Sequence, residues 1–166
     1  MGADKRTRSY SWSDPGHSWS RLGRISGLRY LRAVIDGVVP PPPVCVAMRF
    51  QLEEVTEGRV VYSGTPGEDF ANDVGSIQGG WTAALIDAAI GSAVHSALPV
   101  GVTYTTLENK VNFVRAVRPD SGQLRCEAQT LHIGRRIGTA EARVRDRSGK
   151  LYAHASTTCL IVPMSE

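Results

Sequence analysis

The hydrophobic pattern of the chain first changes near residue 23. Residues 1–22 are polar and have no hydrophobic period, and this composition predicts a flexible arm. Apolar side chains then recur at helical spacing, which predicts a short amphipathic helix over residues 24–37. Asp36-Gly37 is a helix stop signal, and four prolines at 40–43 prevent the helix from continuing. The apolar positions that define this helix are Ile25, Leu28, Leu31 and Ile35.

Beyond the prolines the hydrophobic period falls to two, which is typical of half-buried strands. Turn residues separate the segments, among them Glu57-Gly58 and Ser148-Gly149. Connections this short require antiparallel neighbours. The predicted strands cover residues 45–55, 59–65, 103–117, 122–134, 137–147 and 151–163.

One segment between the strands, VGSIQGGWTAALIDAAIGSAVHSAL (74–98), is almost entirely apolar or small and carries a single acid, Asp87. A helix that is apolar on nearly all sides is a buried helix, and its many small residues let a sheet approach its axis closely. We therefore predict an α+β fold in which one curved antiparallel sheet wraps a long central helix. The domain would cover residues 23–166, with its core at 45–163 and an extra N-terminal helix.

Charge is distributed unevenly along the chain. The net charge is +3, yet the first 32 residues hold seven Lys or Arg against two Asp. Nucleic-acid binding would have to depend on this basic arm, which has no recognisable nucleic-acid-binding motif, so we expect no nucleic-acid partner. No stretch reaches the roughly 20 apolar residues that a bilayer span needs, so we expect no membrane partner.

Cysteine and histidine usage argues against metal and disulfide chemistry. Three cysteines are widely spaced, form no CxxC pair and are odd in number, which favours a reducing, cytoplasmic setting. The four histidines show no metal-ligand spacing with one another or with the cysteines, so we expect no metal site. No other cofactor is expected either.

A set of motifs resembles the hotdog-fold thioesterases, and within them the phenylacetic-acid-degradation and 4-hydroxybenzoyl-CoA thioesterase branch. The set comprises Asn72, the Gln78-Gly79-Gly80 entry to the central helix and Asp87 about two turns into it. The later pattern HIGRR…EARVRDRSGKLYAHAS is also similar. The family usually has His-Gly-Gly where this chain has Gln78-Gly79-Gly80. The resemblance covers roughly residues 45–163 and implies the hotdog fold.

The resemblance implies that Asp87 activates water, or attacks directly, at a thioester carbonyl. The alternative is a structural carboxylate that is hydrogen-bonded to an amide or paired with a basic side chain. Glycines at the start of a helix leave backbone N–H groups unpaired and accessible. The amides of Gly79 and Gly80 can therefore donate hydrogen bonds to a carbonyl oxygen that gains negative charge. Tight packing of the helix start against a strand is the other interpretation, and both can hold together.

Gln78 can donate a hydrogen bond to a carbonyl, but it cannot act as an acid. A thiol with a pKa of roughly 8.5 can leave as thiolate, so Gln78 is compatible with activity. The resemblance places Asn72 near the attacking water or carbonyl, although Asn-Asp is also turn-prone. It places a water-holding hydroxyl at Thr105 or Thr106, which face opposite sides of a strand, so only one of them can serve.

Arg135 and Arg136 follow Gly134 in a turn, where guanidinium groups suit the phosphates of coenzyme A or simply face solvent. The family pairs two sheets edge to edge into dimers, which commonly assemble into tetramers. The resemblance then implies a site between subunits. One chain would supply Asp87 and the Thr105/Thr106 position, and its partner Asn72, Gln78 and Gly79.

The leading hypothesis is therefore an acyl-CoA thioesterase that hydrolyses a thioester to a free acid and coenzyme A. The rival is a non-catalytic hotdog protein that binds acyl-CoA or serves in assembly, and the Gln at position 78 favours it. A hydratase is a third possibility, but the helix entry lacks the Asp and His pair that such chemistry uses.

Overall fold

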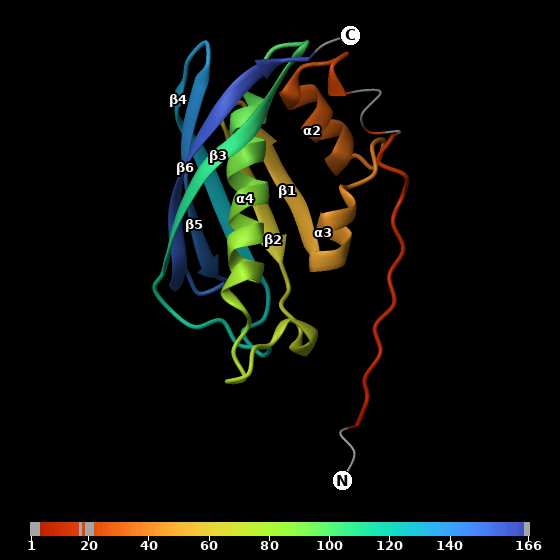
Figure 1. Cartoon of the computed structure of the whole chain (residues 1–166), viewed down its shortest axis with the longest axis vertical. Coiled ribbons are helices and arrows are strands. Elements are labelled where there is room, and N and C mark those ends of the chain that lie inside the picture. Colours follow the sequence, from red (N-terminus) through yellow and green to blue (C-terminus); the bar gives the residue numbers. More distant parts are fainter. Residues whose placement is uncertain (1–3, 17, 19–21, 165–166) are drawn as a thin grey trace.

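A single six-stranded antiparallel sheet curves around one long helix in the computed structural model, which describes residues 4–16, 18 and 22–164 (Figure 1). The strand order β1-β2-β4-β5-β6-β3 places the first strand at one edge of the sheet and the third strand at the other. The predicted α+β architecture is confirmed, and each of the six predicted strands has a counterpart, although β3 ends at Phe113 rather than at residue 117. The strands are β1 Phe50–Thr56, β2 Arg59–Gly64, β3 Val102–Phe113, β4 Leu124–Ile133, β5 Ile137–Asp146 and β6 Leu151–Pro163.

The central helix, α4 (Gly79–Ser96), lies in the concave face of the sheet (Figure 1). One side of α4 is fully buried against the strands, through Leu85, Ile86, Ile90 and Val94. Its other side is only partly covered, and Asp87 there is exposed. The helix is thus buried along the sheet, as its composition predicts, while its one acid stays outside the core.

The prediction of a strand from Cys45 is wrong for residues 45–48. These residues belong to a short helix, α3 (Pro43–Met48), and β1 begins only at Phe50. Pro43 occupies the first helical position, where proline has the φ angle of a helix and where its missing N–H is not needed. Arg49 then ends α3 in the left-handed conformation, with φ of 59°.

The N-terminal helix, α2 (Gly27–Ile35), is shorter than the predicted 24–37 and ends before Asp36-Gly37, as the stop signal predicts. It crosses the C-terminal part of α4, and the amide of Gly27 donates to the carbonyl of Leu98 at 3.1 Å. A Cβ on Gly27 would overlap the carbonyl oxygen of His95, so only glycine permits this approach. Residues 1–3, 17 and 19–21 of the predicted arm lie outside the described residues.

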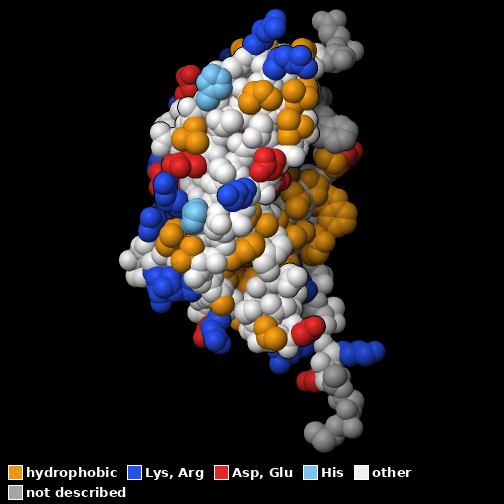
Figure 2. Space-filling model, turned by 60° about the vertical axis from the view of Figure 1, so that its left-hand side comes forward, with side chains coloured by type: hydrophobic (Ala, Val, Ile, Leu, Met, Phe, Trp, Pro, Cys, Tyr) orange, Lys and Arg blue, Asp and Glu red, His pale blue; other side chains and the backbone are white. Residues whose placement is uncertain are grey.

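The edge strand β3 pairs with β6 on one side only. Its large apolar side chains Leu107 and Phe113 are exposed, at 58% and 57%. Figure 2 shows hydrophobic side chains gathered along one flank, beside a face that carries scattered charges of both signs.

Among the described residues, no helix has the length and apolar character to cross a bilayer, and no three potential metal-binding side chains cluster.

His95, near the end of α4, is a buried titratable group. Its ring lies 5.6 Å from that of Tyr30 and 5.9 Å from that of Tyr104, between α2 and β3. Its Nε2 has no hydrogen-bond partner among the described residues. Burial lowers the pKa of His95 to about 4, so the imidazole is neutral at physiological pH.

The free energy of unfolding should therefore depend on pH through His95. The folded pKa of about 4 lies below the unfolded value of about 6.5, so the stabilisation is complete above pH 6.5 and is lost as the pH falls toward 4. Measured by urea unfolding, the free energy of unfolding should fall by up to about 3 kcal/mol between pH 6.5 and pH 4 because of His95. The His95→Phe variant keeps a ring between the two tyrosines and should show a flatter pH dependence. Equal slopes in both proteins would contradict this account.

Candidate active site

The carboxylate of Asp87 is held by two side chains of β3. Asn109 Nδ2 donates to Asp87 Oδ1 at 2.6 Å, and Thr106 Oγ1 donates to the same oxygen at 3.2 Å. The second oxygen of the carboxylate has no side-chain donor among the described residues. Asp87 is therefore oriented, exposed and able to accept a further hydrogen bond from water or a ligand.

The β3 register decides which threonine meets the acid. Thr106 pairs with Cys159 of β6 and points to Asp87, while Thr105 pairs with Leu160 and lies on the other side. The sequence left this choice open, and the structure selects Thr106.

Asn109 is the site residue that sequence reasoning missed. In a regular strand, residues 106 and 109 would face opposite sides, because side chains alternate with a period of two. The register shifts between Thr106 and Glu108, so Leu107 is an extra residue in a β-bulge. This single insertion brings Asn109 to the same side as Thr106, and the sequence has no clear signal for it.

The start of α4 offers free backbone donors. Gln78 is the N-cap, its side chain makes no capping hydrogen bond, and its backbone amide donates to the Phe70 carbonyl at 2.8 Å. The amide of Gly79 has no acceptor among the described residues. A Cβ on Gly80 would meet nothing within 4 Å, so space beside it is open. Bare N–H groups at the positive end of a long helix suit a carbonyl oxygen that gains negative charge.

Asn72 is engaged by its own loop. Its Nδ2 donates to Ser76 Oγ at 2.9 Å, and its Oδ1 accepts from the amides of Val74 and Ser76 at 3.1 Å. These contacts match the turn-forming alternative for this residue. Asn72 also lines, with Gly79 and Phe113, a hollow of about 340 Å³ beside the start of α4.

The two groups of candidate residues are separate within one chain. Asp87 follows Gly79 by eight residues, which places them about 12 Å apart along the helix axis. A single thioester carbonyl cannot contact both. Arg135 and Arg136 lie in the exposed turn between β4 and β5, near the C-terminal half of α4, where Gly138 meets Val94. The chain does not bring these arginines to Gln78 or Gly79.

A mainly apolar cavity of about 250 Å³ opens beside Asp87, between α4 and the segment around α3. Tyr62, Ser92 and Tyr104 also line a second cavity of about 360 Å³ toward α2, so the two adjoin. Tyr62 and Ser92 share a hydrogen bond of 3.1 Å, and burial raises the pKa of both tyrosines, which stay neutral. The apolar residues of the first cavity are Pro42, Val44, Cys45, Phe50, Ala84 and Ala88.

Comparisons with known proteins identify a similar family and similar folds. Residues 74–153 match the model of the Thioesterase superfamily. A candidate esterase of Halobacterium salinarum is 39% identical over 72 residues, a match that spans 42% of this chain and 46% of that protein. The chain thus covers less than half the length of this curated relative.

Three solved structures share the fold. A phenylacetic acid degradation-related protein of Ralstonia eutropha JMP134 is 27% identical, with a TM-score of 0.72, over 79% of this chain and 98% of that one. A conserved protein of Pseudomonas aeruginosa is 30% identical, with a TM-score of 0.69, over 74% and 95%. A Streptococcus mutans UA159 protein bound to acetyl-CoA is 20% identical, with a TM-score of 0.64, over 70% and 91%.

A long helix wrapped by one curved antiparallel sheet is the hotdog fold. Residues 74–153 are similar to the Thioesterase superfamily, and the chain has the hotdog fold of its structural neighbours.

The Tyr104 side chain, which lines the cavity, restricts substitution at Gly91. A Cβ at this position would overlap the Tyr104 hydroxyl and lie 2.7 Å from ring atoms, so Tyr104 would have to move. Gly91→Ala should lower the free energy of unfolding by about 1–2 kcal/mol, because overpacking outweighs the gain in helix propensity. Gly80→Ala, with open space around it, is the matched control and should not destabilise. Thermal unfolding of both variants checks this, and equal melting temperatures would count against it.

Proposed function

We propose that the protein is an acyl-CoA thioesterase, which hydrolyses a thioester to a free acid and coenzyme A. The observation that carries the proposal is Asp87, oriented by Thr106 and Asn109 at the mouth of an apolar cavity. The superfamily match supports thioester chemistry, and the acetyl-CoA in the related Streptococcus mutans structure supports a CoA ester as the substrate. The cavity would take the acyl group, because its lining is mostly apolar.

Asp87 acts as general base or as nucleophile at the thioester carbonyl carbon. As a base it takes a proton from water while the water oxygen bonds to that carbon. The C–S bond then breaks, coenzyme A leaves as thiolate, and the proton on Asp87 returns to the sulfur. Because a thiolate is a good leaving group, Gln78 need not supply an acid. Thr106 and Asn109 keep the carboxylate aimed at the carbonyl.

The carbonyl oxygen is held by the Gly79 amide and the Gln78 side chain, which gain strength as negative charge develops on it. The distance of about 12 Å along α4 supports a second subunit as the source of these donors. We therefore propose a homo-oligomer whose sheets join along β3, an edge strand on which Leu107 and Phe113 are exposed. Each site combines Asp87 and Thr106 of one chain with Asn72, Gln78 and Gly79 of its partner.

In such an assembly Gly80 and Thr105 line the substrate path, and Arg135 and Arg136 bind the coenzyme A phosphates. The exposure of both arginines and the absence of an acidic partner among the described residues support this role. The proposal also places the protein in the cytoplasm, where CoA thioesters and reduced thiols such as those of its three free cysteines occur.

A non-catalytic acyl-CoA-binding role is the second candidate, and the observation that favours it is Gln78, which cannot transfer a proton. The two candidates separate in one assay. An enzyme releases thiol from an acyl-CoA, whereas a binding protein retains it intact.

Thiol release from aromatic, short and long acyl-CoAs should be lost in Asp87→Asn, by at least about a hundredfold, because the base or nucleophile is removed. Thr106→Val should lower kcat by about tenfold or more, since one hydrogen bond to the carboxylate is gone. Thr139→Val, at a β5 threonine that does not donate to Asp87, is the control and should retain activity. The proposed role of Asp87 would fail if the Asp87→Asn dimer turned over the same substrates at the natural rate.

The two-subunit site can be tested by mixing inactive variants. Gly79→Pro removes one N–H group, and the Gln78 backbone, at ψ 132°, already has the conformation that precedes proline. Asp87→Asn and Gly79→Pro should each be inactive, yet an equal mixture after subunit exchange should recover about a quarter of natural activity, since half of the dimers carry one intact site. No recovery in verified mixed dimers would place both groups in one chain.

A further inference from the structure

Residues 4–14 of the predicted arm contact the body of the protein through Arg6 and Arg8. Residues 4–14 form neither helix nor strand, and they pass beside α3 and the loop before α4 (Figure 1). This loop contains the short 3-10 helix η1 (Glu68–Phe70), which leads through residues 71–77 to the start of α4. The arm therefore reaches the segment that presents Gln78 and Gly79.

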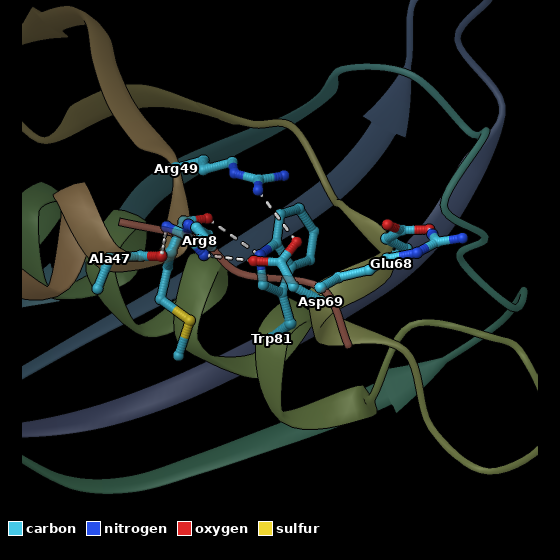
Figure 3. A network of polar contacts seen from close by, with 8 residues as sticks. Arg8, Ala47, Arg49, Glu68, Asp69 and Trp81 are labelled. Atoms are coloured by element: carbon cyan, nitrogen blue, oxygen red, sulfur yellow. Dashed lines mark hydrogen bonds and ion pairs between the residues drawn. The ribbon is translucent and has the colours of Figure 1, made fainter. Parts of the chain in front are cut away.

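Arg8 makes most of the contacts between the arm and this loop (Figure 3). Its Nη1 donates to Asp69 Oδ2 at 2.6 Å, and its Nη2 donates to the Ala47 carbonyl in α3. The guanidinium carbon lies 5.2 Å from the centre of the Phe70 ring, a cation–π distance. Arg8 has a side-chain exposure of 24%, so these contacts are partly shielded from water.

Asp69 joins the arm to a second arginine. Arg49 Nη2 donates to the other carboxylate oxygen at 3.0 Å (Figure 3). The guanidinium carbon of Arg49 lies 5.6 Å from the centre of the Phe70 ring. Burial raises the pKa of Asp69, but the hydrogen bonds and charges of both arginines outweigh it and leave that pKa below its usual range. Arg8 and Arg49 thus fix Asp69 and Phe70 from the arm and from the end of α3.

Phe70 in turn holds the start of α4. Its carbonyl accepts the backbone amide of Gln78 at 2.8 Å. Its ring packs 6.2 Å from that of Trp81, whose indole N–H donates to the Met48 carbonyl at 3.0 Å. A displacement of Phe70 would therefore move both the N-cap of α4 and the first turn behind it.

We propose that Arg8 is a positioning residue, through which the N-terminal arm fixes Phe70 and so sets the place of the Gln78-Gly79 donors. The effect on catalysis rests on the proposed thioesterase function; the effect on the α4 start does not. Donors aimed at a developing charge lose much of their effect when they are displaced by a fraction of an ångström. Arg8 acts through its contacts with Asp69, Phe70 and the Ala47 carbonyl, and it is not placed against the substrate.

Arg6 provides a matched control on the same arm. It pairs with Glu68, but the two side chains are 72% and 60% exposed, and exposed ion pairs contribute little. Arg6→Ala removes the same charge from the same segment two residues away. It should leave the η1 loop in place.

Amide hydrogen exchange tests the positioning role without any substrate. In Arg8→Ala, exchange in residues 70–81, which include the Gln78 amide, should become about tenfold faster than in the natural protein, while Arg6→Ala stays unchanged. Exchange in β5 and β6 should be unaffected, which separates a local change from general destabilisation. Unchanged exchange in residues 70–81 of Arg8→Ala would overturn the proposal, whether or not the protein releases thiol.

Steady-state kinetics then test the catalytic consequence. With an acyl-CoA that the natural protein hydrolyses, Arg8→Ala should lower kcat by about tenfold and change KM less than twofold, because the donors act mainly in the transition state. Arg8→Lys keeps the charge and loses the paired donors, so its kcat should lie between those of the natural protein and Arg8→Ala. Faster exchange with unchanged kcat would overturn the positioning role in catalysis. A natural protein without thiol release would refute the proposed function and leave the exchange result to decide the role of Arg8.

Discussion

Close contact between α4 and the elements around it is the constraint on which the rest of the structure depends. Gly91 lets the helix meet Tyr104 of β3, Gly138 lets β5 approach Val94, and Gly27 lets α2 reach the backbone at His95. With larger residues at these positions the helix would stand away from the strands. Asp87 would then lie beyond the reach of Thr106 and Asn109. The small residues of the chain thus determine the geometry of the acid as well as the packing of the core.

The same packing explains how a charged residue is accommodated in an apolar helix. The sheet covers one side of α4 and leaves the other side to α2, α3 and the cavity between them. Asp87 projects from the uncovered side and remains hydrated, so the fold avoids the cost of burying a charge. Hydrogen bonds from β3 then supply orientation, which water alone could not give.

Much of this fold follows from the sequence, because alternation and turn residues are local signals. The strands, the central helix and the stop at Asp36-Gly37 were predictable in this way. The helix at Pro43–Met48 was not, since an apolar run after prolines is equally typical of a strand, and packing against β1 decides it. Asn109 was hidden because a bulge breaks the alternation from which facing residues are inferred. The separation of Asp87 from Gly79 was readable from helix geometry alone, whereas the anchoring of Arg8 depends on contacts between distant segments.

The bulge at Leu107 has a second effect, on the free edge of the sheet. An extra residue interrupts the even spacing of N–H and C=O groups along β3, so a strand that docks there cannot slide past this point without losing hydrogen bonds. A regular edge strand can pair with another strand in several alignments, which favours non-specific association. An irregular edge accepts few alignments and so resists disordered aggregation. The extra residue that brings Asn109 to the same side as Thr106 therefore also limits the alignments in which another strand can pair with the free edge of β3.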